Sequence, residues 1–336
     1  MDNYEVFRRY APAVALMGTM GLLRAAATPV HDPAALAEAE ARVLSHIKTP
    51  ISHRFVQAGA HQIHTVIAGS GPALVMLHGH GGGVGVWSHV LETLAQHFRV
   101  YAVEWLGWGR SDRPVFTGTT PEEARDWWVN SLEDWRRAMG LTDFFLLGHS
   151  LGGWMSAEYA LAHGKHLRQL VLVNPAGMVD YSEVAKSLFY YVSPQRMVQA
   201  IGPLGPRLVE YGCRDEAGRC LSGGEALLEY YYRLAMAPLS GQLAFERILT
   251  PRHWHLPLLP RAEGFSMPTT ILWGLNDELL RIQHAHYFHS RLPRGNMVLI
   301  PDAEHSPHCT APSRFIEAVI SSLGNSTHEG RLPHAS

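Results

Sequence analysis

The fold of this chain is indicated most directly by one stretch near its middle, Phe144-Phe145-Leu146-Leu147-Gly148-His149-Ser150-Leu151-Gly152-Gly153. The apolar run at its start predicts a strand, and residues 154–163 after it predict a helix. Between them, Gly-X-Ser-X-Gly is typical of a sharp turn that exposes a nucleophilic serine, where glycines relieve the crowding. The helix N-terminus behind Ser150 also favours developing negative charge. The alternative is a glycine-bounded turn with a structural serine, and the surrounding pattern favours the nucleophile.

Short apolar runs bounded by glycine or proline recur on both sides of this turn. We predict strands at residues 62–68, 73–78, 100–104, 144–147, 170–174, 269–273 and 297–300. Such runs are typical of buried parallel strands. One helix is predicted between the cap Asp32 and Pro50, with Pro33 at its first position, and another after Thr120, where Glu123 closes a capping box. The alternation predicts an α/β fold with a mostly parallel, doubly wound sheet.

The alternation stops over residues 179–267, which are rich in Tyr, Leu, Arg and Pro. Residues 230–232 and 256–260 in this segment are predicted to be helical and amphipathic. Because ligands bind at the carboxyl ends of parallel strands, an insertion there predicts a lid over the site. The predicted division is an N-terminal apolar segment at 1–30, a first part of the core at 31–178, a helical lid at 179–267, a second part of the core at 268–322 and a flexible tail at 323–336.

The composition excludes several classes of protein. The formal net charge is -2, so no strong positive field exists to attract nucleic acid. No uncharged apolar stretch reaches the roughly 18 residues of a membrane-spanning helix. Residues 11–23 are nonetheless apolar apart from Thr19 and follow Arg8 and Arg9. They predict a helix on a membrane surface or packed on the protein; a signal peptide is a third reading, against which Asp2, Glu5 and Arg24 count.

Cysteines and histidines predict neither a disulfide scaffold nor a metal site. The chain is long and has three cysteines, of which Cys213 and Cys220 flank a turn and could pair only in an oxidising compartment. Among 21 histidines, His253 with His255 and His284 with His286 lie close in sequence, but each pair lacks a third ligand at a suitable spacing. We therefore expect no metal and no cofactor.

A second glycine-rich motif follows the strand at 73–78, namely His78-Gly79-His80-Gly81-Gly82-Gly83. Attack on an ester forms a tetrahedral oxyanion that needs two positioned N–H donors. We assign these to the backbone N–H of Leu151 and of His80, with Gly79 and Gly81 as alternatives for the second. A phosphate-binding loop is disfavoured because no Gly-Lys-Ser/Thr follows.

A nucleophilic serine needs a base, and the base needs an acid to orient it. In strand–turn–helix serine hydrolases the chain order is serine, acid, histidine. Asp277 follows the strand at 269–273 and is the predicted acid, ahead of its neighbour Glu278 and the weaker option Asp180. His305 follows the final strand and is the predicted base, with His308 as its competitor.

These motifs resemble those of the α/β-hydrolase superfamily. A further stretch adds to the resemblance, namely Leu106-Gly107-Trp108-Gly109-Arg110-Ser111-Asp112-Arg113-Pro114. More narrowly, the chain resembles subfamilies four and five of the α/β-hydrolase domain-containing proteins, which include lysophospholipase-type hydrolases and lipid-droplet lipase coactivators. The narrower resemblance extends over residues 35–322 and is carried by residues 39–44, 78–87, 135–140, 230–232 and 240–241.

The resemblance implies a serine hydrolase of lipid acyl esters, of phospholipase or lysophospholipase type. It also implies a cytoplasmic protein, peripheral on membranes or lipid droplets. A general carboxylesterase for small esters and a non-hydrolytic lipase coactivator are the alternatives. Some members have lost the nucleophile, whereas this chain keeps Ser150. Members linked to acyl transfer onto lysophosphatidic acid have an aspartate five residues after the histidine, where this chain has Thr310.

Overall fold

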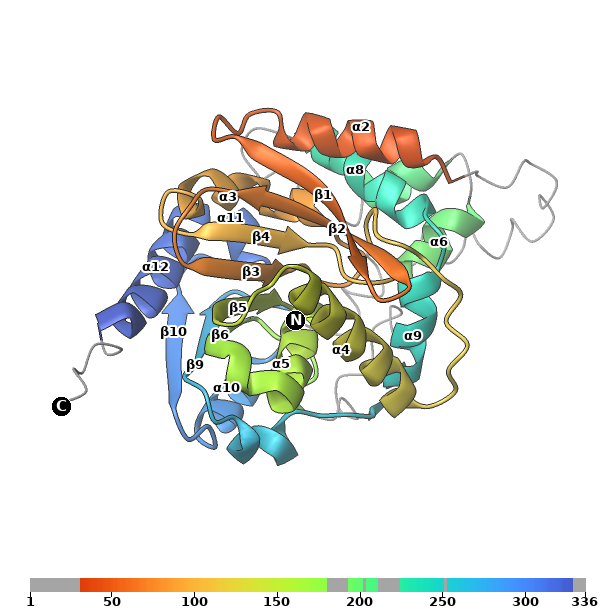
Figure 1. The fold of residues 1–336 in the computed structure, drawn as a ribbon. Helices are drawn as coiled ribbons and strands as arrows, with labels where there is room; N and C mark the ends of the chain where they lie inside the picture. Colours follow the sequence, from red (N-terminus) through yellow and green to blue (C-terminus); the bar gives the residue numbers. More distant parts are fainter. Residues whose placement is uncertain (1–30, 180–192, 202–203, 211–223, 251–252, 329–336) are drawn as a thin grey trace.

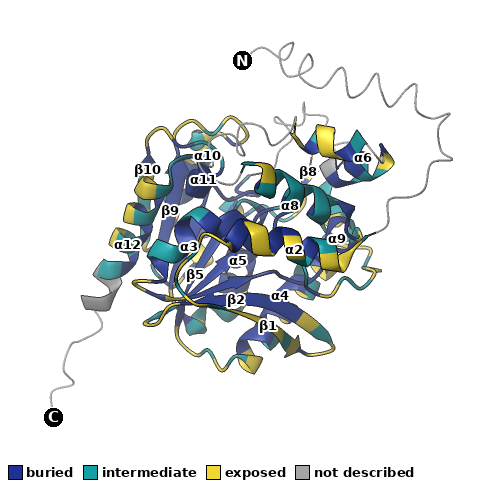
Figure 2. Cartoon of the chain, turned by 90° about the horizontal axis from the view of Figure 1, so that it is seen from above, coloured by how far each residue is buried: buried dark blue, intermediate teal, exposed yellow. Residues whose placement is uncertain are grey.

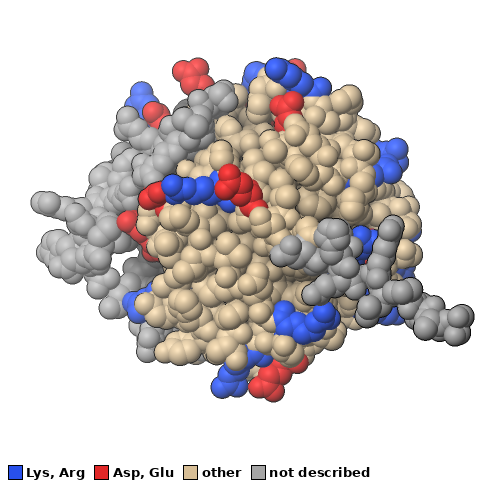
Figure 3. Space-filling view, turned by 90° about the vertical axis from the view of Figure 1, so that its left-hand side faces the viewer, with Lys and Arg blue, Asp and Glu red and all other residues tan. Residues whose placement is uncertain are grey.

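The computed structural model describes residues 31–179, 193–201, 204–210, 224–250 and 253–328 (Figure 1). The predictions for residues 1–30, for Asp180, for Cys213 and Cys220, and for the end of the tail lie outside these residues. Among the described residues, no helix is both long and apolar enough to cross a membrane. On the side that carries α12 (Pro312–His328), Lys and Arg are scattered rather than gathered in one patch (Figure 3).

An eight-stranded sheet forms the centre of the fold. Its order is β1-β2-β4-β3-β5-β6-β9-β10. The pairs from β4 to β10 are parallel, so the predicted α/β fold with a mostly parallel sheet is confirmed. The strands are β1 (Ile51–Ala58), β2 (His61–Ala68), β3 (Ala73–Leu77), β4 (Arg99–Val103), β5 (Phe144–His149), β6 (Leu167–Val173), β9 (Thr269–Gly274) and β10 (Gly295–Ile300).

One end of the sheet differs from the sequence prediction. The run at 62–68 was expected to be parallel, but β2 pairs antiparallel with both β1 and β4. Strand β1 was not predicted at all, because polar residues interrupt its apolar ones and no apolar run marks it; its residues are mostly exposed (Figure 2). It is held by the β2 hairpin, whose turn contains Gly59 at φ 58°, a left-handed conformation that glycine adopts without strain.

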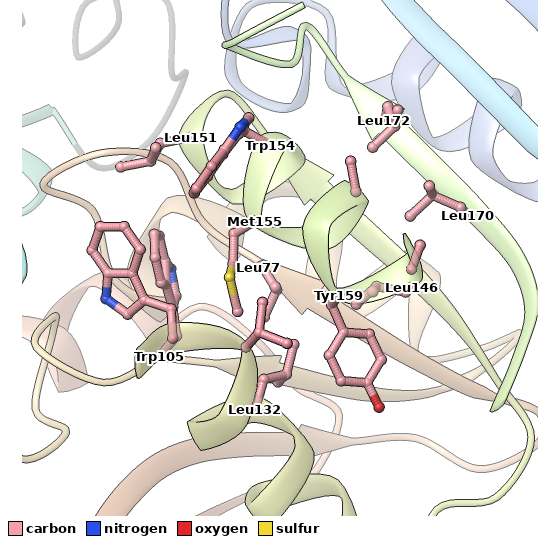
Figure 4. Packing of buried hydrophobic residues seen from close by; sticks show 14 of the residues in the cluster. Leu77, Trp105, Leu132, Leu146, Leu151, Trp154, Met155, Tyr159, Leu170 and Leu172 are labelled. Atoms are coloured by element: carbon pink, nitrogen blue, oxygen red, sulfur yellow. The ribbon is translucent and has the colours of Figure 1, made fainter. Parts of the chain in front are cut away.

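Helices cover both faces of the sheet. Successive residues of β3 point to opposite faces, so Val75 and Leu77 join one apolar cluster and Leu74 and Met76 the other. The first cluster packs under α4 and α5, where Leu77, Leu132 and Met155 lie close together (Figure 4). The helices around the sheet are α2 (Pro33–Leu44), α3 (Ser88–Leu94), α4 (Pro121–Ala138), α5 (Leu151–His163), α10 (Ile282–His289), α11 (Pro307–Thr310) and α12.

Both predicted helix starts are confirmed. The carboxylate of Asp32 accepts hydrogen bonds from the backbone N–H groups of Ala34 and Ala35, each at 3.0 Å. Thr120 and Glu123 form the predicted capping box at the start of α4. The first helix ends at Leu44, well before the expected stop at Pro50.

The described part of residues 193–267 is mainly helical, as predicted. Tyr230–Tyr232 lie in α8, which packs against α2. The prediction for 256–260 is wrong in part, because helical structure starts only at Leu259. A two-strand ribbon was also not predicted. The elements are α6 (Pro194–Ala200), α8 (Gly224–Met236), α9 (Ser240–Ile248), β7 (Leu249–Thr250), β8 (His253–Trp254) and a 3₁₀ helix (Leu259–Gly264).

Candidate active site

Ser150 lies in the turn between β5 and α5. Its backbone has φ 53° and ψ -118°, a conformation that non-glycine residues rarely adopt. The turn is held because the N–H of Ser150 donates to the Val173 carbonyl at 3.0 Å and its carbonyl accepts from Ala176 at 3.0 Å. A Cβ on Gly148 would collide with the Gly152 carbonyl, and one on Gly152 with the His78 carbonyl. The two glycines of the motif are therefore required by the close approach of neighbouring backbone.

The structure brings Ser150, His305 and Asp277 into one hydrogen-bonded chain. Nε2 of His305 lies 3.0 Å from Oγ of Ser150, and Nδ1 of His305 lies 2.9 Å from Oδ2 of Asp277. Because an ionised carboxylate only accepts, Nδ1–H donates to Asp277, which leaves Nε2 to accept the serine proton. The side chain of His305 is 18% exposed and that of Asp277 is fully buried.

Four donors surround the carboxylate of Asp277. Its Oδ1 accepts from the backbone N–H groups of Leu279 at 2.8 Å and Leu280 at 2.9 Å. Its Oδ2 accepts from His305 and from the side-chain amide of Asn174 at 2.6 Å. Burial alone would raise the pKa of Asp277, but His305 and these hydrogen bonds outweigh it and lower the pKa. Asp277 is therefore held as a carboxylate.

Asn174 is a part of the site that the sequence reasoning missed. It directly follows β6, has φ 39°, and its side-chain oxygen accepts from the N–H of Gly274 at 3.1 Å. Asn174 therefore links the end of β6 to the end of β9, where Asp277 begins its turn. The sequence feature that could have identified Asn174 is its position at the carboxyl end of a predicted parallel strand.

The competing residues lie elsewhere. Glu278, the alternative acid, is exposed. His308 is buried between the rings of Trp87 at 4.5 Å and His149 at 4.7 Å, and burial lowers its pKa to about 3. It is therefore a neutral packing residue at physiological pH, and it is His305 whose ring bonds to Ser150.

His149, next to the serine, supports the base through the backbone. Its Nε2–H donates to the carbonyl of His305 at 2.9 Å, and the two rings lie 5.0 Å apart. Burial, reinforced by His308 and His305, holds the pKa of His149 well below its usual value. A neutral imidazole fits this position, because a second charge beside His305 would disfavour its protonation.

The glycine-rich loop lies directly beside the serine. A Cβ on Gly79 would lie 3.2 Å from the Cβ of Ser150. The ring of the next residue, His80, turns away toward α9, where its Nε2–H donates to Gln242 at 2.7 Å. His80 could therefore contribute to the site only through its backbone N–H, and Gly79 and Gly81 remain the alternative donors.

Leu151 is the first residue of α5, so its N–H has no acceptor within the helix. Its side chain is buried in the apolar cluster beside Trp154 (Figure 4). The two predicted oxyanion residues, Leu151 and His80, thus both belong to segments that touch Ser150, and both could contribute only through the backbone.

A cavity of about 600 Å³ lies away from these residues, between β10 and α12. Its lining follows β10 from Arg294 to Pro301 and includes Gln169 and Thr269 from β6 and β9. None of Ser150, His305 and Asp277 lines this cavity, so it is not the space in which the serine would meet a substrate.

Comparison with known proteins places this geometry in context. Residues 72–198 match the α/β hydrolase fold family. A 1-acylglycerol-3-phosphate O-acyltransferase of Arabidopsis thaliana is 35% identical over 329 residues, covering 84% of this chain and 78% of that protein. A (lyso)-N-acylphosphatidylethanolamine lipase of Bos taurus is 31% identical, covering 72% and 77% respectively. Among solved structures, a bacterial membrane phospholipase A has a TM-score of 0.71 at 21% identity, covering 95% of this chain and 99% of that one, a likeness of fold.

Proposed function

This chain belongs to the α/β-hydrolase family, within its subfamily four and five group, and we propose from that premise that it is a serine hydrolase of lipid acyl esters. The observation that carries the proposal is the hydrogen-bonded chain from Ser150 through His305 to Asp277 on a strained strand-to-helix turn. The substrate class we propose is a phospholipid or lysophospholipid, in keeping with the lipid-acting relatives.

In the proposed reaction, Oγ of Ser150 attacks the ester carbonyl carbon while Nε2 of His305 takes the hydroxyl proton. The oxyanion that forms accepts hydrogen bonds from the backbone N–H groups of Leu151 and His80. Collapse breaks the bond to the alcohol, which leaves with the proton from His305. Water then attacks the carbonyl carbon of the acyl-serine while His305 takes a proton from it. Collapse breaks the bond to Oγ of Ser150, which receives that proton, and the fatty acid is released. Asp277 stays ionised and stabilises the protonated imidazole.

The experiment that tests this function combines a fluorophosphonate probe with a panel of lipid and small esters. Only an activated serine reacts with the probe, so labelling separates a hydrolase from a lipid-binding coactivator with an idle site. Preference for phospholipids over short soluble esters separates the lipid hydrolase from a general carboxylesterase. Absence of both labelling and ester turnover would reject an enzymatic role.

Acyl transfer is the second candidate function, because several relatives are named as 1-acylglycerol-3-phosphate O-acyltransferases. Members linked to acyl transfer have an aspartate five residues after the histidine, and Thr310 occupies that position here. Its hydroxyl accepts from the N–H of Glu304 at 3.0 Å and donates to the Ser306 carbonyl at 3.2 Å, so it braces the loop that carries His305.

We expect acyl transfer from acyl-CoA to lysophosphatidic acid to be absent or slower than hydrolysis in the purified protein. Thr310 lacks the carboxylate that the resemblance associates with transfer. The measurement is the ratio of phosphatidic acid to fatty acid formed from a labelled acyl donor. Transfer faster than hydrolysis that disappears in Thr310→Ala would contradict this expectation.

We also propose that the protein meets its substrate at a lipid surface near the loop that carries Asp277. Leu275 and Leu279 flank Asp277, and the two residues are 45% and 47% exposed. Inserting apolar surface into a membrane is favourable by about 25 cal/mol per Å², or about 1.5–3 kcal/mol for a leucine that becomes fully buried. Two such leucines would give reversible attachment beside the site.

Replacing Leu275 and Leu279 with serine is expected to weaken vesicle co-sedimentation about tenfold or more. Turnover of phospholipid in vesicles should fall with it, whereas turnover of a small soluble ester should persist, because the backbone donors to Asp277 remain. Phe55→Ser is the matched control, since Phe55 is 47% exposed on β1 at the far edge of the sheet. An equal loss of vesicle binding in Phe55→Ser would refute a membrane contact specific to Leu275 and Leu279. Truncation of residues 1–30 would then test whether that segment binds the vesicle.

A further inference from the structure

Three potential metal ligands from separate elements meet behind the glycine-rich loop. Glu40 comes from α2, His53 from β1 and His64 from β2. His53 pairs in register with Val66, two residues beyond His64, so the two histidines share one face of the hairpin. Helix α2 packs over this face and adds the carboxylate of Glu40, which is buried, as is His64, while the side chain of His53 is 34% exposed.

The separations between the three ligand atoms suit one small metal ion. Oε1 of Glu40 lies 3.5 Å from Nδ1 of His53 and 3.8 Å from Nε2 of His64, and the two nitrogens lie 3.2 Å apart. In a tetrahedral zinc site, bonds of about 2.0–2.2 Å place ligand atoms about 3.3–3.5 Å from one another. The three atoms therefore need to move by only a few tenths of an ångström to share an ion.

A buried carboxylate orients one of the two imidazoles. Nδ1–H of His64 donates to Glu104 at 2.7 Å, which leaves the lone pair of Nε2 facing Glu40 and His53. A carboxylate behind a histidine is the usual arrangement around metal-binding histidines, because it fixes the tautomer and strengthens the ligand. Nδ1 of His53 lies 3.2 Å from that Nε2, so one hydrogen bond joins the two rings, and a metal would take the place of its proton.

Two carboxylates and two guanidinium groups surround the cluster. Glu40 and Glu104 are both buried, and Nη1 of Arg110 donates to Glu40 at 2.7 Å. Arg110 also donates its backbone N–H to Glu104 at 2.7 Å and lies over the ring of Phe55. The guanidinium of Arg113 interacts electrostatically with Glu104 as well. The two guanidinium groups offset the two carboxylates, so the geometry of the three ligand atoms, and not net charge, favours a metal.

We propose that Glu40, His53 and His64 bind a zinc ion, with Glu104 as the partner that orients His64. Two imidazoles and one carboxylate suit zinc better than calcium or magnesium, which prefer oxygen ligands. The site is separate from Ser150, and its occupation would join α2 to the β1–β2 hairpin. Glu104 also accepts from the N–H of Val84 at 2.9 Å and from the hydroxyl of Tyr230 at 3.1 Å. The ion would therefore brace the end of the glycine-rich loop and helix α8, through Glu104.

The test compares full-length protein with two histidine variants after chelator treatment. His53→Ala removes a ligand from a partly exposed position, so the fold should survive. His61→Ala is the matched control on the same hairpin, where the side chain is 33% exposed and lies outside the cluster. Zinc content after dialysis, the zinc-dependent rise in melting temperature, and the visible absorption of bound cobalt(II) are measured for each protein.

We expect the wild type and His61→Ala to retain one equivalent of zinc that His53→Ala loses. The zinc-dependent rise in melting temperature and the absorption of tetrahedral cobalt should be lost with it. Equal melting of all three proteins without metal would show that the variants fold alike. Equal zinc content, thermal shift and cobalt absorption in wild type and His53→Ala would overturn the proposal. All these readouts measure metal binding, so their outcome does not depend on the ester hydrolysis proposed above.

Discussion

Ser150→Ala is expected to lower ester turnover by about 10³-fold or more and to abolish labelling by a fluorophosphonate probe. The substitution removes the one oxygen that would form the acyl-enzyme, and His305 would lose the hydrogen-bond partner of its Nε2. The fold should be retained, because the backbone hydrogen bonds of Ser150 to Val173 and Ala176 do not involve the hydroxyl. The residual rate would come from oxyanion stabilisation and substrate binding alone.

Ser156→Ala provides the matched control for this substitution. Ser156 lies in α5, the helix that follows Ser150, is fully buried, and its hydroxyl has no hydrogen-bond partner among the described residues. Its removal should leave turnover and labelling close to wild type. The proposed mechanism would be wrong if Ser150→Ala kept near-wild-type turnover on every ester that the wild type cleaves.

Asp277→Asn is expected to lower turnover by about 10⁴-fold, by analogy with other Ser-His-Asp systems. An amide has a similar volume, but its NH₂ group cannot accept the Nδ1 proton of His305. The imidazole would then favour the other tautomer, in which Nε2 carries a proton and cannot take one from Ser150. Probe labelling should slow as well, because the serine would no longer be activated.

The pH dependence of stability gives a second measurement on Asp277. Its pKa is lowered in the folded protein, so its carboxylate stabilises the fold above the pKa of the unfolded chain. That contribution is lost as the pH falls through the folded-state pKa. Asp277→Asn should therefore flatten the decline in stability toward acid pH, as measured by denaturant unfolding over a pH series.

Glu278→Gln is the control for the acid. Glu278 neighbours Asp277 in sequence but is exposed, so its neutralisation should have little effect on turnover. A loss of about 10⁴-fold in Glu278→Gln, together with unchanged turnover in Asp277→Asn, would show that Glu278 is the acid.

The sequence by itself determined the features that depend on neighbouring residues. The Gly-X-Ser-X-Gly turn, the capping box at Thr120 and the buried runs of the parallel strands are all local patterns, and each appears in the structure. Chain order and the ends of predicted strands also sufficed to nominate Ser150, Asp277 and His305 together. This works because parallel strands all end at one edge of the sheet, which brings the following loops together.

Tertiary structure decided the features that depend on residues far apart in the chain. Strand β1 mixes polar and apolar residues and is mostly exposed, so no apolar run marks it, and only its pairing with β2 reveals it. The choice of His305 over His308 depends on which ring faces the serine, and three residues of spacing do not fix that. Asn174 became part of the site only through its contact with Asp277.

The cluster of Glu40, His53 and His64 shows the same limit. The sequence predicted no metal site because Glu40, His53 and His64 lie on three separate elements and form no motif along the chain. Hydrogen bonding between β1 and β2 and the position of α2 bring the three ligand atoms within 4.8 Å of one another. Local periodicity encodes neither the pairing of a mostly exposed edge strand nor the position of a helix on a sheet, because both are set by burial across the whole fold.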